Sequence, residues 1–177
     1  MKTALALILF VGCACAQEQG ALGQSMAACG SSNIQFAAKT STSQPVSQPE
    51  PNKALIYLIE DFPGKVLGIN PTIRFGMDGA WLGATRSDSY FWQAIEPGEH
   101  HLCVNWQSSL GRFSKLAAFA GFTAEAGKVY YFRAHIIASG FGGRNGNAMD
   151  LDLDLLNPDE GRFLAASYEW STSHPKK

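Results

Sequence analysis

The feature that most constrains this chain is a series of short segments in which apolar and polar residues alternate. Apolar side chains recur at every second position of residues 72–77, 100–106 and 128–138, which is the period of a half-buried β-strand. Turn-forming pairs interrupt the series at residues 78–79 (Asp-Gly) and 97–98 (Pro-Gly), because glycine tolerates the positive φ of a tight turn. The pattern predicts an all-β fold, a single antiparallel β-sandwich of about seven or eight strands.

Two segments require a choice between helix and strand. Residues 113–127 contain good helix formers, but their apolar residues alternate and a glycine lies inside the segment, which favours a strand. Residues 158–166 favour a short helix, because Asn157 suits the N-cap and Pro158 suits the first turn.

The composition limits the classes of function. Lys plus Arg number 14 and Asp plus Glu number 15, so the formal net charge is −1 and a nucleic-acid partner is not expected. Hydrophobic residues make up 46% of the chain, which argues against global disorder. No apolar run reaches the roughly 18 residues that span a bilayer, so a polytopic membrane protein is not expected either.

Residues 1–16 have the organisation of a signal peptide. A lysine precedes a short apolar stretch, and residues 14–16 (Ala-Cys-Ala) place small residues before a cleavage point. We therefore expect cleavage between Ala16 and Gln17, and export to the periplasm or the extracellular space as a soluble protein. A second interpretation stays open: Cys13 follows a small residue as in a lipoprotein signal, and lipidation there would anchor the chain to the membrane.

Residues 17–52 are interpreted as an N-terminal segment and a linker. Ser, Thr, Gln and Pro dominate residues 40–52, which cannot bury enough apolar surface to offset the entropy of ordering. Residues 33–39, just before this linker, could form a short strand or a docking segment. Residues 53–177 are predicted to form one all-β domain.

Two cysteines, Cys29 and Cys103, follow the predicted cleavage site. An even pair in an exported chain is interpreted as a disulfide. In the strand predicted over residues 100–106, the apolar residues share one face and Cys103 lies on the other. The bridge should therefore pin the N-terminal segment across the outer face or the edge of a sheet.

Five segments, in the same order, resemble the bacterial domain-of-unknown-function family 2846 over roughly residues 54–134: ALIYLIED, MDGAWLGA, SYFW, IEPGEHHL and AEAGKVYYFRA. The resemblance implies an exported or lipid-anchored envelope protein with an all-β fold and no assigned activity, so it transfers no catalytic residue. The order of the Asp-Gly hairpin and the Pro-Gly turn also resembles transthyretin-like surface domains. We therefore expect a sandwich that is transthyretin-like or immunoglobulin-like in general shape.

Motifs of catalysis and cofactor binding are scarce. The sequence lacks G-x-S-x-G, H-E-x-x-H and the P-loop pattern. Residues 140–146 approach a dinucleotide-binding fingerprint, but Asn145 replaces its last glycine and the segment joins two strands. We expect no cofactor and no enzymatic activity. One alternative stays open: His101 shares a face with Cys103, so a secreted hydrolase or thiol enzyme could use the pair as base and nucleophile.

Asp150, Asp152 and Asp154 alternate with leucines, which predicts a row of carboxylates on the outward face of a strand. In the tightest hairpin with the preceding strand, Arg133 lies opposite Asp152. His135 then faces Asp150, and a shift of two residues would keep the face and move Arg133 to a neighbouring aspartate. Calcium needs about six to eight converging oxygens, so we interpret the row as a solvated face, expect no metal site, and expect calcium to leave the melting temperature unchanged.

Aromatic residues are dense on the predicted strands, and adjacent residues of a strand point to opposite faces. Phe91 and Tyr131 are therefore candidates for an exposed binding patch, together with Arg133 and His135. The partner would be an envelope protein or a glycan, with membrane contact only if Cys13 is lipidated. The sequence thus favours a non-enzymatic binding or structural module of the cell envelope.

Overall fold

The computed structural model describes most of the chain, namely residues 28–43, 45, 47–62, 70–138 and 149–177. The predicted signal peptide, its cleavage site, Cys13 and the glycine-rich segment at 140–146 lie outside the described residues. The described ranges contain ten strands and two helices: β1 (Phe36–Ser41), β2 (Ala54–Asp61), β3 (Thr72–Met77), β4 (Ala80–Arg86), β5 (Ser89–Ile95), β6 (Gly98–Trp106), α2 (Gly111–Ser114), β7 (Ala117–Ala124), β8 (Val129–Ala138), β9 (Met149–Leu155), α3 (Pro158–Ser167) and β10 (Glu169–Pro175).

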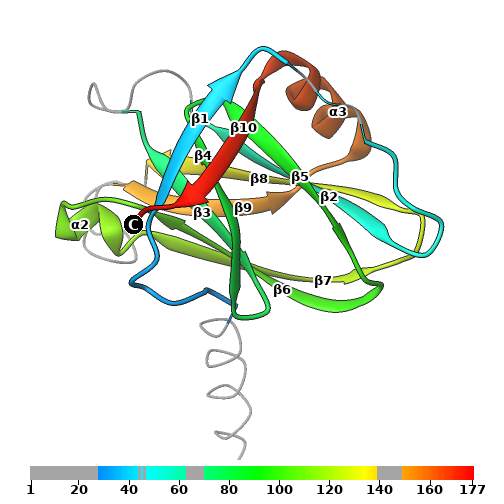
Figure 1. The fold of residues 1–177 in the computed structure, drawn as a ribbon, viewed down its shortest axis with the longest axis horizontal. Helices are drawn as coiled ribbons and strands as arrows, with labels where there is room; N and C mark the ends of the chain where they lie inside the picture. The colour runs from blue at the N-terminus through cyan, green and yellow to red at the C-terminus, as the bar shows by residue number, and fades with distance from the viewer. Residues whose placement is uncertain (1–27, 44, 46, 63–69, 139–148) are drawn as a thin grey trace, which may run out of the picture.

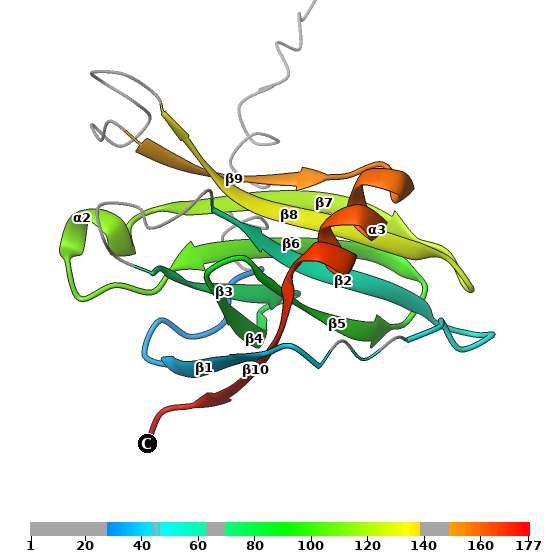
Figure 2. The same cartoon turned by 90° about the horizontal axis from the view of Figure 1, so that it is seen from above.

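The strands form two sheets that enclose a shared apolar core (Figures 1 and 2). The six-stranded sheet has the order β1-β10-β5-β2-β8-β9, and the four-stranded sheet has the order β4-β3-β6-β7. Ile56 and Leu58 of β2 project from one sheet toward Phe75 of β3 and Val104 of β6, and all four side chains are fully buried. The inward positions follow the predicted alternation, so the fold is mostly β and sandwich-like.

The prediction of about seven or eight strands is too low, because the described chain has ten. β1 and β10 pair antiparallel at one side of the six-stranded sheet. A short strand was one of the two possibilities stated for residues 33–39, and β1 overlaps that segment. β10 was not predicted, because its sequence EWSTSHP contains few apolar residues. β1 lies on the N-terminal side of residue 53, so the chain before the predicted domain also enters the sheet.

The six-stranded sheet is mixed, which corrects the expectation of a wholly antiparallel sandwich. β2 runs antiparallel to β5 but parallel to β8, and β10 runs parallel to β5. After β5 the chain forms β6 and β7 in the other sheet and then returns as β8 beside β2. A parallel neighbour requires a long crossover of this kind. The alternation of apolar residues indicates which face of a strand is buried, but it does not indicate the direction of the strand. The sequence pattern therefore does not predict that parallel and antiparallel pairs occur in the same sheet.

The predicted turns and capped helix are confirmed. At the β3–β4 hairpin, Asp78 and Gly79 have φ values of 50° and 86°, as a primed turn requires. Gly98 also has a positive φ, 141°, after the β5–β6 turn. β7 occupies residues 117–124 as a strand. The side chain of Asn157 accepts hydrogen bonds from two backbone N–H groups at the start of α3.

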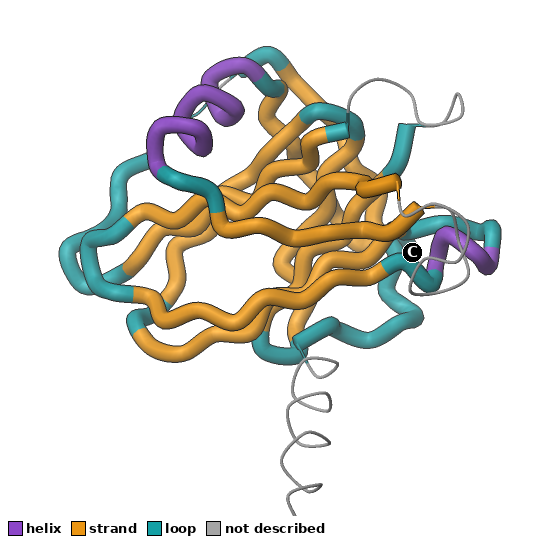
Figure 3. The backbone as a smooth tube through the Cα atoms, turned by 180° about the vertical axis from the view of Figure 1, so that it is seen from behind, coloured by secondary structure: helices purple, strands orange, loops and turns teal. Residues whose placement is uncertain are grey.

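Helix α3 covers part of the outer face of the six-stranded sheet and lies at one end of its strands (Figures 2 and 3). Beneath it, the rings of Tyr57 and Tyr131 stack with their centroids 4.8 Å apart. The same second apolar cluster contains Tyr90 and the aliphatic side chains of Leu55, Ile59, Leu156 and Leu164. The part of the face beneath α3 is therefore apolar, while charged residues lie beside it on the same face.

Candidate functional site

Arg133 of β8 is the centre of a charged cluster on the outer face of the six-stranded sheet. Its guanidinium donates to Asp154 of β9 at 3.0 Å and to Glu160 of α3 at 3.1 Å. A carboxylate oxygen of Asp61, at the end of β2, lies 3.6 Å from a guanidinium nitrogen of Arg133. The Arg133 cluster, as we name it, consists of Asp61, Arg133, His135, Asp152, Asp154, Glu160 and Tyr168.

Strand register explains how these residues meet. Parallel pairing of β2 with β8 sets Asp61 opposite His135. Antiparallel pairing of β8 with β9 sets Arg133 opposite Asp154, and His135 opposite Asp152. The hairpin is therefore shifted by two residues from the tightest register, and the predicted outward face is retained. The leucines between the aspartates face the core, as predicted.

Tyr168 closes the cluster on the side of α3. Its hydroxyl donates a hydrogen bond of 2.6 Å to a carboxylate oxygen of Asp61. Burial, and then this hydrogen bond to an anion, raise the pKa of Tyr168 well above its ordinary value. The hydroxyl of Tyr168 therefore stays protonated and donates its hydrogen bond to Asp61, which it positions beside Arg133.

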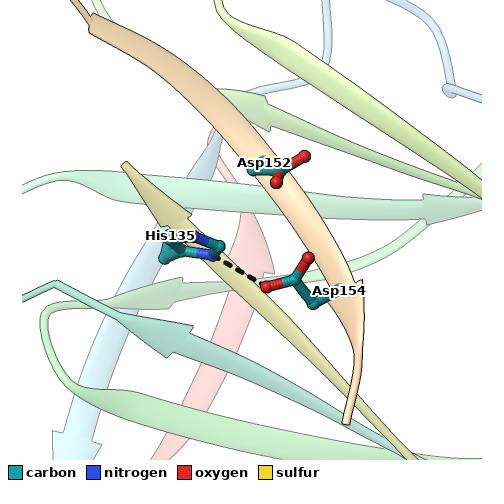
Figure 4. Close-up of side chains that lie close together, drawn as sticks. All are labelled: His135, Asp152 and Asp154. Carbon is teal, nitrogen blue, oxygen red and sulfur yellow. Dashed lines mark ion pairs between the residues drawn. The ribbon is translucent and has the colours of Figure 1, made fainter. Parts of the chain in front are cut away.

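Figure 4 shows that His135 and Asp154 point toward each other across β8 and β9, with Asp152 farther along β9. The Nδ1 atom of His135 lies 3.3 Å from an Oδ atom of Asp154. One ligand atom from each of the three side chains falls within 4.8 Å of the other two. A histidine nitrogen and two carboxylates on adjacent strands are ligand types that divalent transition metals accept.

The structure separates the four residues predicted as a binding patch. Arg133 and His135 lie together in the cluster, half-buried. Phe91 instead faces the core between the sheets and is 8% exposed, while Tyr131 is 7% exposed beneath α3. The alternation predicted that some aromatic would point outward but could not indicate that a helix covers that face. Asp61, Glu160 and Tyr168 were not predicted, because they come from distant parts of the sequence that only the fold brings together.

The predicted disulfide between Cys29 and Cys103 is confirmed, with the two Cα atoms 5.2 Å apart. Cys103 is fully buried on the outward face of β6, beneath the N-terminal segment. His101 borders a shallow surface hollow of about 270 Å³ with His100 and Phe122. The thiol that the alternative enzyme requires is therefore bonded and shielded.

A second anchor for the N-terminal segment was not predicted. Arg74 is buried and donates to the carbonyl oxygens of Ile34 and Ser32 and to the side chain of Asn105. Its guanidinium also lies 4.3 Å from the ring centroid of Trp81. Together with the disulfide, these contacts hold the segment across the four-stranded sheet.

Glu60 is a buried carboxyl on the inward face of β2. It follows Ile56 and Leu58 at the same parity in β2, and its side chain has no exposed surface. Thr85 donates a hydrogen bond of 2.5 Å to one carboxyl oxygen, and the other oxygen has no hydrogen-bond partner among the described residues. Burial raises the pKa of Glu60 well above its ordinary value, so this carboxyl favours the protonated form.

Comparison with known families gives a match over residues 50–147 to the model described as a protein of unknown function, DUF2846. No curated protein matches the chain. Within the described ranges, no helix is both long and apolar enough to cross a membrane.

Proposed function

This chain belongs to the DUF2846 family of proteins of unknown function, and from that premise we propose that it is an exported, non-enzymatic binding or structural module of the cell envelope. The disulfide supports export, since structural disulfides persist in oxidising compartments. The periplasm or the extracellular space, as the N-terminal pattern predicts, is such a compartment.

The observation that carries the proposal is the state of Cys103. A thiol enzyme needs an accessible thiolate with a base in hydrogen-bond reach. Cys103 is bonded to Cys29 and has no exposed surface. The enzyme built on Cys103 and His101 therefore has no nucleophile to use, whereas a binding module benefits from the rigidity that the bridge adds.

We place the interaction surface on α3 and the Arg133 cluster beside it. Phe163 is 69% exposed, the largest exposure among the large apolar side chains of the described residues. Glu160 precedes Phe163 by three positions, so the two side chains are neighbours on the helix surface. An exposed aromatic beside charged groups is a typical composition for a protein interface, and an envelope protein is the partner that we expect.

Site-specific photo-crosslinking tests the proposal in the exporting cell. Phe163 is replaced by benzoylphenylalanine, which keeps an aromatic ring at the position. Leu110, also exposed and located before α2 at the opposite end of the molecule from α3, provides the matched control (Figure 1). We expect a discrete crosslinked species from position 163 and none from position 110. Equal products from both positions, or none from either, would contradict a specific interface at α3.

A further inference from the structure

We propose that His135, Asp152 and Asp154 bind a divalent transition-metal ion of the Zn²⁺ type. The inference goes beyond the proposed function, because it requires no envelope partner. It also replaces the expectation that the aspartate row is only a solvated face.

The three side chains come from two directly paired strands, so the backbone fixes their relative positions. His135 and Asp152 are opposite each other in the β8–β9 ladder, and Asp154 is the next outward residue of β9. Their candidate ligand atoms lie within 4.8 Å of one another. Tetrahedral Zn²⁺ sets its ligands roughly 3.4 Å apart, given bond lengths of about 2.0–2.2 Å. Small side-chain rotations would therefore close the arrangement around an ion (Figure 4).

Two polar groups of the trio are unsatisfied. The Nδ1 atom of His135 is shielded from solvent and has no hydrogen-bond partner among the described residues, although Asp154 lies 3.3 Å away. Within the part of the chain that the structure describes, Asp152 has neither a hydrogen bond nor an ion pair. A metal ion would coordinate both groups at once.

The surrounding charge favours a cation. The cluster holds the carboxylates of Asp61, Asp152, Asp154 and Glu160 around the single cation Arg133. Arg133 contacts Asp154, but it also contacts Glu160 and Asp61. The guanidinium can therefore keep two acidic partners while Asp154 turns toward a metal.

The ligand types separate Zn²⁺ from calcium. Calcium takes about six to eight oxygen ligands, whereas this trio offers two carboxylates and one imidazole. Zn²⁺ accepts nitrogen and oxygen together and is satisfied by three protein ligands with one open position. The earlier expectation that calcium leaves the melting temperature unchanged is therefore kept.

The test uses the mature protein, purified without a histidine tag and stripped with a chelator. Calorimetric titration with ZnCl₂ should show one site per chain, and Zn²⁺ should raise the melting temperature by mass action. His135→Ala and Asp152→Asn should each weaken Zn²⁺ binding at least tenfold, with circular dichroism confirming that the variants are folded. Asp159→Asn, a 92%-exposed carboxylate of α3, and His101→Ala should bind as the wild type does.

Co²⁺ provides an independent spectroscopic measurement, because a nitrogen–oxygen site of low coordination number gives visible ligand-field absorption that should disappear in His135→Ala. Absence of Zn²⁺ binding by the wild type would overturn the inference. So would unchanged affinity in both His135→Ala and Asp152→Asn, which would place the ion elsewhere. A calcium-dependent rise in melting temperature that is lost in Asp152→Asn would overturn it in favour of an oxygen-only site.

Discussion

The backbone of Gly161 in α3 lies directly against the ring of Tyr131 in β8: a Cβ atom at Gly161 would come within 2.2 Å of the Tyr131 ring. This close approach lets the helix bury the stacked tyrosines of the sheet. Because Glu160 is the preceding residue, the same contact positions one carboxylate of the Arg133 cluster.

Gly161→Ala should therefore destabilise the protein by about 1–3 kcal/mol, the typical effect of overpacking. Helix propensity alone predicts the opposite sign, since alanine is favoured over glycine by about 1 kcal/mol within a helix. Gly111→Ala in α2, where an added Cβ meets no atom within 4 Å, is the control and should not destabilise. Denaturant titration of both variants measures the difference. A Gly161→Ala protein as stable as the wild type would contradict the packing described.

Removing the disulfide should lower stability strongly. The bridge spans 74 positions of the sequence, and the chain-entropy model assigns a loop of this size roughly 4 kcal/mol. The double variant Cys29→Ala, Cys103→Ala is compared with the reduced and the oxidised wild type in urea. The variant should match the reduced protein in its unfolding midpoint, and a match to the oxidised protein would mean that the bridge adds nothing.

The alternation of apolar residues predicted most strands and their inward faces, because burial on one face imposes a period of two. Cys103 could be placed on the outer face for the same reason. The Asp-Gly and Pro-Gly pairs predicted the β3–β4 hairpin turn and the β5–β6 turn, of which the second connects the two sheets. The Arg133 cluster was predicted only in part: local patterns identified Arg133, His135 and the aspartates. The contribution of Asp61 depends on parallel pairing, and that of Glu160 on a helix folding back over the sheet. Neither leaves a local signature in the sequence.

Glu60 should make stability fall as the pH rises. A carboxyl whose pKa is raised in the folded state binds its proton more tightly when the chain is folded. Its contribution to the free energy of unfolding is therefore fully present below the unfolded pKa of 4.5, and it is lost as the pH rises toward the raised pKa of the folded state. Glu60→Gln should therefore leave stability nearly unchanged at pH 4 and increase it relative to the wild type at pH 8. Glu50→Gln, on the exposed linker, is the control. If the stabilities of the wild type and Glu60→Gln change with pH in parallel, Glu60 is not the cause of the loss of stability at high pH.

His100 links the two turns at one end of the four-stranded sheet. Its ring contacts Asp78 at 2.6 Å and the carbonyl oxygen of Glu96 at 2.8 Å, and only the protonated ring can donate to both. Burial alone would lower the pKa of His100, but these two contacts outweigh it and raise the pKa above 6.5. The stabilisation that protonated His100 gives to the folded state is therefore fully present below pH 6.5, and it is lost as the pH rises through the raised pKa of His100.

Asp78→Asn keeps a residue that tolerates positive φ and removes the charge. The variant should lose about 0.5 kcal/mol at pH 6 and almost nothing at pH 9, because the pair is partly exposed. Urea unfolding at the two pH values measures this. An equal loss at both would assign the effect to the turn geometry and not to the charge on His100.

The proposed function depends most on export of the chain and on closure of the Cys29–Cys103 bridge. Intact-mass spectrometry of the protein recovered from the producing cells tests both directly. After denaturation in an alkylating agent without reductant, we expect one species that begins at Gln17, has lost two hydrogens to the Cys29–Cys103 disulfide and carries no alkyl group. An acylated N-terminal Cys13 would contradict the soluble form and indicate a membrane anchor. Two alkylated cysteines would contradict the bridge, and with it the argument against a thiol enzyme.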